Sequence, residues 1–408
     1  MRLRHAGIAV VAVVILGSIV GLTGHARSSE ITMHEWGTFT TVAGSDGRAI
    51  NWLPLGGPSD LPCFVKHVNA NVMAKVAPGA QAGAQIPFEG LRSRMLAKVR
   101  METPVIYFYS PTEFDASVAV SFNRGIITEF YPTPTQPSLA IYTNTLADPN
   151  FSHTLEWNVR VSPHEKPLFP NGGTASHYYA ARETDATPLK VGVETEKFIF
   201  YRGIANFDVP IQTKLLANGD VEVWNLAVEG ALPSVILFES RGGKMGYRVA
   251  GELAKADTLS PPELTSDITS IRKELTKDLV RAGLFPKEAQ AMVETWKDSW
   301  FEEGSRVFYI LPTGSVSAIL PLRILPAPTH AVRVFVGRQE LIDDASMAAV
   351  KTALEQNDTA TLDRYGRFLS PIADRVIMTT ADQTIREKVA KASKAAFAKY
   401  NAQLRACE

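Results

Sequence analysis

The 408-residue chain has few cysteines and no excess of charge of either sign. It contains two cysteines, and its 42 Lys and Arg residues balance 42 Asp and Glu residues. This balance argues against a general nucleic-acid-binding protein, because such a protein needs a basic surface to displace counterions from phosphates. Apolar residues make up 45% of the chain and charged residues 21%, a composition that excludes a disordered or collagen-like polymer.

Several catalytic and cofactor-binding motifs are absent as well. The sequence contains no His-Glu-x-x-His, no Cys-x-x-Cys and no Gly-x-Ser-x-Gly nucleophile elbow. It also has neither a phosphate-binding loop nor a dinucleotide fingerprint. These absences exclude the enzyme classes that are easiest to recognise, and the residues indicate no cofactor and no metal.

Residues 1–26 have the pattern of an export segment. Arg2 and Arg4 precede an uncharged apolar run at residues 6–24, and Ala26 is a small residue suited to cleavage by signal peptidase. The run is also nearly as long as the roughly 17–25 residues that span a bilayer, so a retained transmembrane anchor is the alternative. In both cases the basic N-terminus stays in the cytoplasm. We therefore expect the rest of the chain to be exported to the periplasm or cell envelope.

The two cysteines, Cys63 and Cys407, are candidates for a disulfide. Export would place them in an oxidising compartment, where thiols pair. Closing so long a loop could stabilise the fold by roughly 5–6 kcal/mol at most, according to the chain-entropy model. Two unpaired thiols are the alternative, because a sequence does not give the Cα separation that a disulfide requires.

Residues 31–338 are predicted to form a β-rich body. Apolar and polar residues alternate with a period of two at 155–161, as in a half-buried strand. Asn218-Gly219 between two β-branched segments predicts a hairpin. Other strand patterns lie at 104–109, 117–122, 126–130, 197–201, 306–311, 315–320 and 331–336. In the first half of the body the strands follow one another without intervening helices, which indicates antiparallel pairing in a sandwich or barrel.

Helical periodicity interrupts this pattern once and dominates the C-terminus. Residues 266–300 are predicted to form two helices, the second with Pro286 in its first turn. We interpret the pair as an insertion into the β-rich body, and a separate domain that begins near Pro261 is the alternative. Residues 341–405 are predicted to form C-terminal helices. The predicted fold class is thus α+β and β-rich, an antiparallel sandwich-like body with an inserted helix pair and a helical C-terminal tail.

Two segments combine ionisable and aromatic side chains. In the first, residues 33–40, His34 and Glu35 would point to opposite faces of a strand, so they are poor partners for one site unless a bulge intervenes. The second, residues 172–185, begins with glycines and is predicted to be a loop, where functional groups are common. His34 and the ionisable residues of the second segment are the candidate catalytic residues.

In the second segment, His177 is predicted to perform acid–base chemistry with Glu183 or Asp185. A carboxylate beside an imidazole sets its tautomer and shifts its pKa, as general acid–base catalysis requires. Arg182 would bind an anionic group of the substrate. The alternative is structural, with Arg182 paired to an acid that stabilises the loop, since buried ion pairs are common without catalysis.

Five motifs resemble those of a family of exported bacterial proteins that carries the sequence HEWGTFT and has no assigned activity. They lie at residues 34–40, 101–105, 182–186, 299–309 and 333–338. The resemblance covers nearly the whole exported part of the chain. It implies an envelope protein and transfers no reaction, because none is assigned to the family.

Two functions fit these observations. The first is a binding or structural component of the envelope, with polysaccharide or protein as its partner and a tether through residues 6–24. The second is a hydrolase or lyase that acts on an extracellular polymer through His177, Arg182, Glu183 and His34. The first predicts that these side chains lie apart, each with its own partner. The second predicts that at least three converge in a concave site lined by aromatic residues.

Overall fold

The computed structural model describes residues 30–56, 61–73, 85–86, 95–136, 138–142, 145–172 and 176–404. The predicted export segment at 1–26 and Cys407 lie outside these residues. Cys63 takes part in a disulfide. In the part of the chain that is described, no helix has the length and apolar character needed to cross a membrane.

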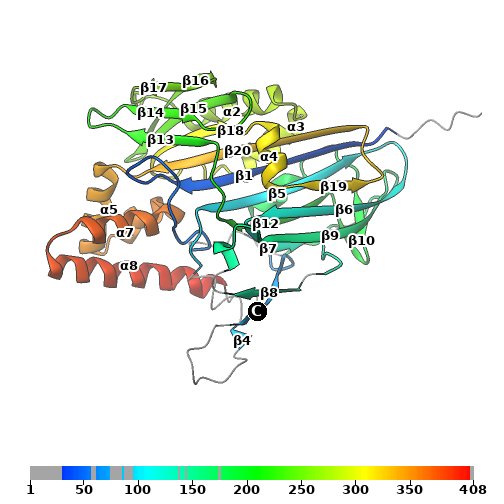
Figure 1. Cartoon of the computed structure of the whole chain (residues 1–408), viewed down its shortest axis with the longest axis horizontal. Helices are drawn as coiled ribbons and strands as arrows, with labels where there is room; N and C mark the ends of the chain where they lie inside the picture. Colours follow the sequence, from blue (N-terminus) through cyan, green and yellow to red (C-terminus); the bar gives the residue numbers. More distant parts are fainter. Residues whose placement is uncertain are drawn as a thin grey trace, which may run out of the picture.

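The fold is α+β and rich in strands, as the sequence predicts. The largest sheet has the order β16 (Lys244–Leu253), β15 (Leu232–Arg241), β18 (Gly304–Ile310), β20 (His330–Leu341), β1 (Thr32–Val42), β5 (Val99–Tyr109), β12 (Phe198–Ala205), β7 (Gly125–Tyr131) and β2 (Lys66–His67). The second has the order β11 (Glu194–Glu196), β10 (Leu189–Val191), β9 (Ser152–Val161), β6 (Phe114–Asn123) and β19 (Leu322–Leu325). The side chains between these two sheets form one hydrophobic core, so they pack as a sandwich (Figure 1).

Two small sheets complete the strand structure. One consists of β13 (Ile211–Leu215), β14 (Val221–Asn225) and β17 (Ala256–Leu259), and the other of β4 (Gln85–Ile86), β3 (Asn69–Met73) and β8 (Ser138–Tyr142). Among the described strands, pairing is antiparallel except in β1–β20 and β3–β8. The parallel pair β1–β20 lies in the middle of the largest sheet. In chain order, β1 is the first strand of that sheet and β20 is the last.

Strand β1 carries the HEWGTFT motif and is buried on both faces. Trp36 packs in the core between the largest sheet and the helices, while Phe39 packs in the core between the two sheets. Gly37 is required for close packing, because a Cβ there would lie 2.7 Å from the ring of Phe335 and 3.1 Å from Pro104. The motif is thus the sequence of a central strand.

The helix pair predicted within residues 266–300 is an insertion between strands of the same body. It consists of α2 (Ile268–Arg281) and α3 (Pro286–Thr295), between β17 and β18, and it covers the face of the largest sheet opposite the second sheet. Asp267 caps α2 by accepting a hydrogen bond from the backbone N–H of Ser270. Pro286 occupies the first turn of α3, as predicted.

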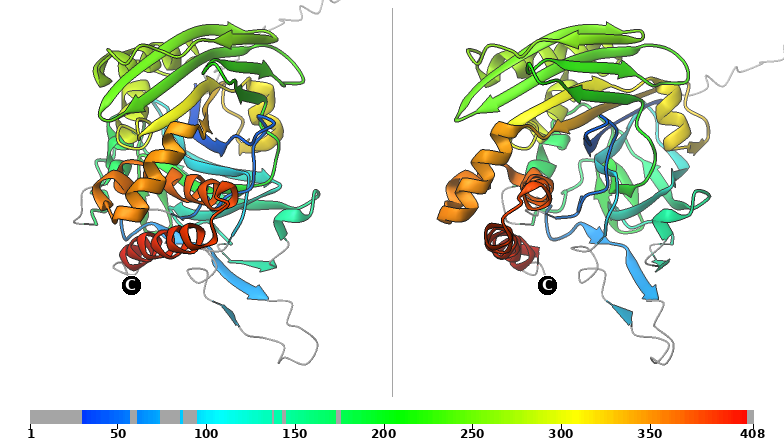
Figure 2. Two further views of the ribbon diagram at one scale, coloured as in Figure 1. Left: turned by 90° about the vertical axis from the view of Figure 1, so that its left-hand side faces the viewer. Right: turned by 60° about the vertical axis from the view of Figure 1, so that its left-hand side comes forward.

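The C-terminal tail is helical and packs against one end of the β-rich body (Figures 1 and 2). It contains α5 (Asp344–Gln356), α6 (Thr359–Arg364), the 3-10 turn η3 (Gly366–Phe368), α7 (Leu369–Thr379) and α8 (Gln383–Leu404). Its own hydrophobic core includes Val42 from β1 and the buried Trp52. Two further 3-10 turns, η1 (Thr145–Ala147) and η2 (His177–Arg182), lie in loops.

One predicted strand is wrong. Residues 315–320 lie mainly in a short helix, α4 (Thr313–Ile319), that follows Pro312. Val316 and Ile319 are its buried residues, three positions apart on one helical face. Over six residues, alternating small polar and apolar side chains fit one helical turn as well as a strand, so periodicity does not distinguish the two.

Candidate functional site

A cavity of about 480 Å³ lies between the helix pair, the β15–β16 hairpin and the C-terminal tail. The residues after α3 form one wall, and the segment joining α6 to η3 forms another. Its polar lining includes His177, Asp298, Ser299, Glu302, Arg364 and Arg367. We call it the Glu302 cavity. It brings together an imidazole, hydroxyls, carboxylates and guanidiniums.

His177 enters this cavity from η2, which Ser176 caps. Its Nε2 lies 2.9 Å from Oδ2 of Asp298, and 65% of the Asp298 side chain is exposed. The predicted pairing of His177 with Glu183 or Asp185 is therefore replaced by a pair with Asp298. Because water surrounds that carboxylate, the pair contributes little to stability and does not form a water-excluded catalytic dyad.

Glu302 is a largely buried carboxylate in the cavity wall, with 12% of its side chain exposed. One oxygen, Oε1, lies 3.7 Å from Nε of Arg367, and Oε2 is buried without a hydrogen-bond partner in the protein. Burial raises the pKa of Glu302, and the charge of Arg367 opposes that rise. Gly366 makes room for the carboxylate, because a Cβ there would collide with Oε1 and its φ of +48° disfavours other residues.

A buried ionic cluster lies behind this wall. Oε1 of Glu102 on β5 accepts hydrogen bonds from Nη2 of Arg338 at 3.2 Å and from Nη1 of Arg367 at 2.5 Å, and it lies 3.3 Å from Nε of Arg100. Arg338 is completely buried, and desolvation lowers its pKa to about 10. The cluster thus holds the cavity wall in place, since β5, β20 and η3 all contribute a charge to it.

A second buried pair extends the cluster along β18 and β20. Nε of Arg306 donates a hydrogen bond of 2.8 Å to Oε2 of Glu340, and neither side chain is exposed. Desolvation raises the pKa of Glu340 to about 7 despite this partner. The guanidinium groups of Arg306 and Arg338 both pack against the ring of Phe368. These contacts connect the C-terminal tail to the largest sheet.

The other residues predicted for the site do not line the cavity. Arg182 forms a bidentate pair with the fully buried Glu196, with Nη2 2.6 Å from Oε2. Its guanidinium lies 5.0–5.7 Å from the ring centroids of Phe64, Phe169, Tyr178 and Tyr179. This enclosure matches the structural alternative for Arg182.

Glu183 and Asp185 lie on the surface. Glu183 is exposed, and Asp185 forms an exposed ion pair of 2.6 Å with Lys287 at the start of α3. His34 is buried in another place, where its Nδ1 lies 2.6 Å from Oε2 of Glu288. Glu288 also accepts a hydrogen bond from Tyr109 and caps α3. These contacts link β1 to α3, and none of the three predicted residues meets His177.

Apart from His177, the residues that line the cavity were not predicted from the sequence. Asp298, Ser299 and Glu302 come from the connection between α3 and β18, and Arg367 comes from the C-terminal tail. One signal was present, because the adjacent acids Glu302-Glu303 follow two aromatic residues in the segment 299–309 that carries the family resemblance. Acids in such apolar surroundings need a buried partner or a ligand.

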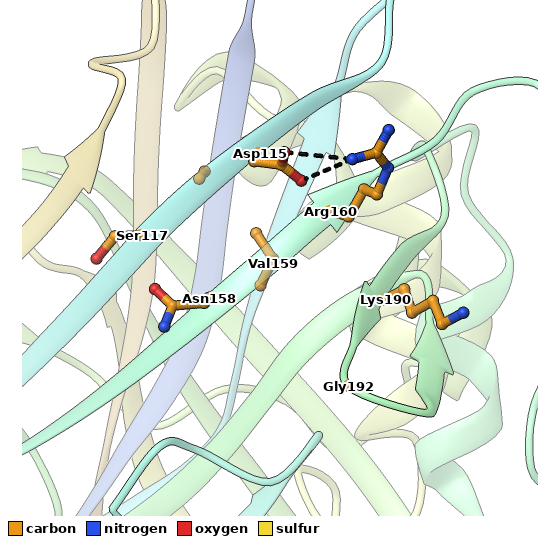
Figure 3. A pocket seen from close by; sticks show the side chains of 8 residues that line it. Asp115, Ser117, Asn158, Val159, Arg160, Lys190 and Gly192 are labelled. Atoms are coloured by element: carbon orange, nitrogen blue, oxygen red, sulfur yellow. Dashed lines mark hydrogen bonds and ion pairs between the residues drawn. The ribbon is translucent and has the colours of Figure 1, made fainter.

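Two other hollows have a less varied set of polar side chains in their lining. A shallow one of about 500 Å³ crosses the outer face of the second sheet, where Asp115 and Arg160 pair beside Asn158 and Lys190 (Figure 3). Its ion pairs are exposed and already complete. An apolar one of about 480 Å³ lies beside α4 and the exposed Val228.

Comparison with known proteins gives no functional assignment. No family model matches the chain, and no curated protein matches it. Among solved structures, the Fcho1 Mu homology domain from Danio rerio with a bound Eps15 peptide aligns with 77% of this chain and 96% of its own. The TM-score is 0.29 and the sequence identity 6%. A similarity this low supports no argument about either fold or ligand.

Proposed function

We propose that this chain is an exported protein of the cell envelope that binds a small polar ligand in the Glu302 cavity and performs no chemistry on it. The observation that carries this proposal is the half-paired, buried carboxylate of Glu302 in a wall made rigid by the Glu102 cluster. A preformed cavity with a few fixed polar groups is typical of ligand-binding sites. A rigid wall also lowers the entropy cost of binding.

Two observations support export. The basic and apolar pattern of residues 1–26 is that of a signal or membrane anchor. Cys63 takes part in a disulfide, and disulfides persist mainly in oxidising compartments. Export is tested by adding protease to spheroplasts of cells that express the full chain. We expect release with the periplasmic contents if the leader is cleaved, or digestion without lysis if it is retained, and in both cases a disulfide in the non-reduced protein. Protection from protease inside the spheroplasts together with reduced thiols would contradict export.

Binding is tested by thermal shift with a panel of sugars, amines, carboxylic acids and short peptides. We expect at least one class to raise the Tm of the wild type and to have a smaller effect on Glu302→Gln, because a ligand that binds only the folded state stabilises it. Equal shifts in both proteins would place the ligand elsewhere. No shift with any class would contradict the proposal.

A hydrolase or lyase is the second candidate, and one observation favours it. The cavity contains a buried acid with a raised pKa, Glu302, together with the exposed Asp298 beside His177. Carboxyl groups in contrasting environments can serve as acid and base. This candidate predicts turnover of an envelope polymer that His177→Ala and Glu302→Gln each reduce by at least about a hundredfold. Unchanged turnover in both variants would exclude it.

A further inference from the structure

We infer that the Glu302 cavity selects ligands that carry a primary ammonium group, with Glu302 as the anchor. This inference rests on the proposed binding function and names the chemical class of the ligand. Oε2 of Glu302 is an acceptor without a hydrogen-bond partner in the protein, and only 12% of the side chain is exposed. A buried carboxylate oxygen gains most from a charged donor, because hydrogen bonds between ionised groups are the strong ones.

The remaining lining favours a cation over an anion. Four carboxylates line the cavity against two guanidiniums. Both guanidiniums already have acceptors, since Arg367 donates to Glu102 and Arg364 donates to the hydroxyl of Thr361. An anionic ligand that reached the remaining N–H groups of these guanidiniums would also approach the acids at close range. Like charges brought together in a partly desolvated site weaken binding.

The lining also limits the size of the ligand and the kinds of group it carries besides the ammonium. A volume of about 480 Å³ accommodates a molecule of one or two sugar rings. Oγ of Ser299 is buried without a hydrogen-bond partner, so it can donate to or accept from a ligand hydroxyl. Met245 and Phe301 supply an apolar wall. An amino sugar and an alkyl amine share the ammonium group that Glu302 would bind, and they differ in what they offer to Ser299.

The test is isothermal titration of the full chain with four probes at neutral pH and low salt. The probes are the glucosamine disaccharide, its N-acetylated form, the galacturonic acid disaccharide and cadaverine. Acetylation removes the charge and keeps the sugar, so we expect the N-acetylated form to bind at least tenfold more weakly than the free amine. If cadaverine binds, the affinity comes from the ammonium group. If cadaverine binds more weakly than the amino sugar does, the sugar hydroxyls also contribute to the affinity.

Variants identify the anchor. Glu302→Gln keeps the shape of the side chain and removes its charge, and we expect it to weaken amine binding at least tenfold. Glu165→Gln is the matched control, because Glu165 is exposed in a turn away from the cavity, and it should bind like the wild type. Circular dichroism checks that both variants fold. If Glu302→Gln does not fold, the comparison of free and acetylated amine on the wild type decides the question.

The outcomes separate this inference from the proposed function. Tighter binding of the N-acetylated or the acidic probe than of the amine would overturn the ammonium inference and leave a binding site in place. Amine binding that Glu302→Gln does not weaken would overturn Glu302 as the anchor. No binding by any of the four probes would overturn the inference, and the thermal-shift panel would then decide whether the cavity binds another class.

Discussion

Strands β9 and β20 both carry charged residues, but their surroundings are opposite. In β9 exposed and buried residues alternate without exception, so Glu156 and Arg160 face water. In β20 every residue from the middle of the strand to its end is buried, including Arg338 and Glu340. The difference follows from the layers, because the second sheet is packed on one face only, whereas helices and the second sheet cover both faces of the largest sheet.

Charged residues of the same types therefore contribute differently to stability in the two sheets. Arg160 on β9 pairs with Asp115 at 3.2 Å (Figure 3). It also pairs with Glu113 at 2.8 Å, yet half of its side chain is exposed. Exposed pairs contribute little, because water and salt screen them. Arg338 on β20 has lost its water, so removing its partner leaves an uncompensated charge in the interior.

The largest effect is expected for Glu102→Ala. This change removes the carboxylate that faces Arg100, Arg338 and Arg367 and leaves three guanidiniums in the interior without it. Breaking one buried ion pair costs about 3–5 kcal/mol, and we expect about 5 kcal/mol here. The free energy of unfolding is measured by urea titration with circular dichroism. A loss below about 1 kcal/mol would show that water reaches the cluster and would remove the distinction between the two sheets.

The next largest effect concerns the buried face of β9. Trp157 is completely buried between the sheets, and its Nε1 donates a hydrogen bond of 2.8 Å to the carbonyl of Pro132. We expect Trp157→Ala to lower the free energy of unfolding by about 4 kcal/mol, because it leaves a cavity that the sheets do not fill. Asn158→Ala is the matched control, since Asn158 is the next residue in the sequence and its side chain faces solvent. Equal losses in both variants would contradict the one-sided packing of this sheet.

The sequence predicted what depends on local pattern. The two-residue alternation at 155–161 placed Trp157 in the core, and the helical spacing within 266–300 identified α2 and α3. Opposite faces for His34 and Glu35 also follow from strand geometry, and their partners lie on different elements, with Glu288 on α3 for His34 and Arg333 on β20 for Glu35.

The sequence did not predict contacts between distant segments. Glu102 and Arg367 are 265 positions apart, and they meet because η3 packs against the end of β5. The partner of Arg182 is Glu196 and not one of the acids nearer to it in the sequence, Glu183 and Asp185. Charge alone does not rank such partners, because the choice depends on which carboxylate the fold buries beside the guanidinium.

A smaller effect is expected from pH through His153, a buried member of β9. Its Nδ1 accepts a hydrogen bond of 3.1 Å from the backbone N–H of Ile127, and burial lowers its pKa to about 4. An unfolded histidine has a pKa near 6.5. Between these values the unfolded chain binds more protons, so the free energy of unfolding decreases as the pH falls from about 6.5 to about 4, by roughly 3 kcal/mol in total.

The matched variant for this prediction is His153→Gln, whose amide oxygen can accept the same hydrogen bond and does not titrate. We expect its urea midpoint to decline less than that of the wild type over this pH range. Parallel declines in the two proteins would assign the acid sensitivity to other groups and place His153 in contact with water.

The smallest effect is expected for Arg160→Ala on the exposed face of β9. The change removes two ion pairs, with Glu113 and with Asp115. All three side chains are well exposed, so water solvates each carboxylate again when the guanidinium is lost. We expect a urea midpoint within the error of the wild-type value, both at low salt and at high salt. A clear loss at low salt that disappears at high salt would show that this face concentrates charge. The number of ion pairs would then matter as well as their burial, and the contrast between β9 and β20 would be one of degree.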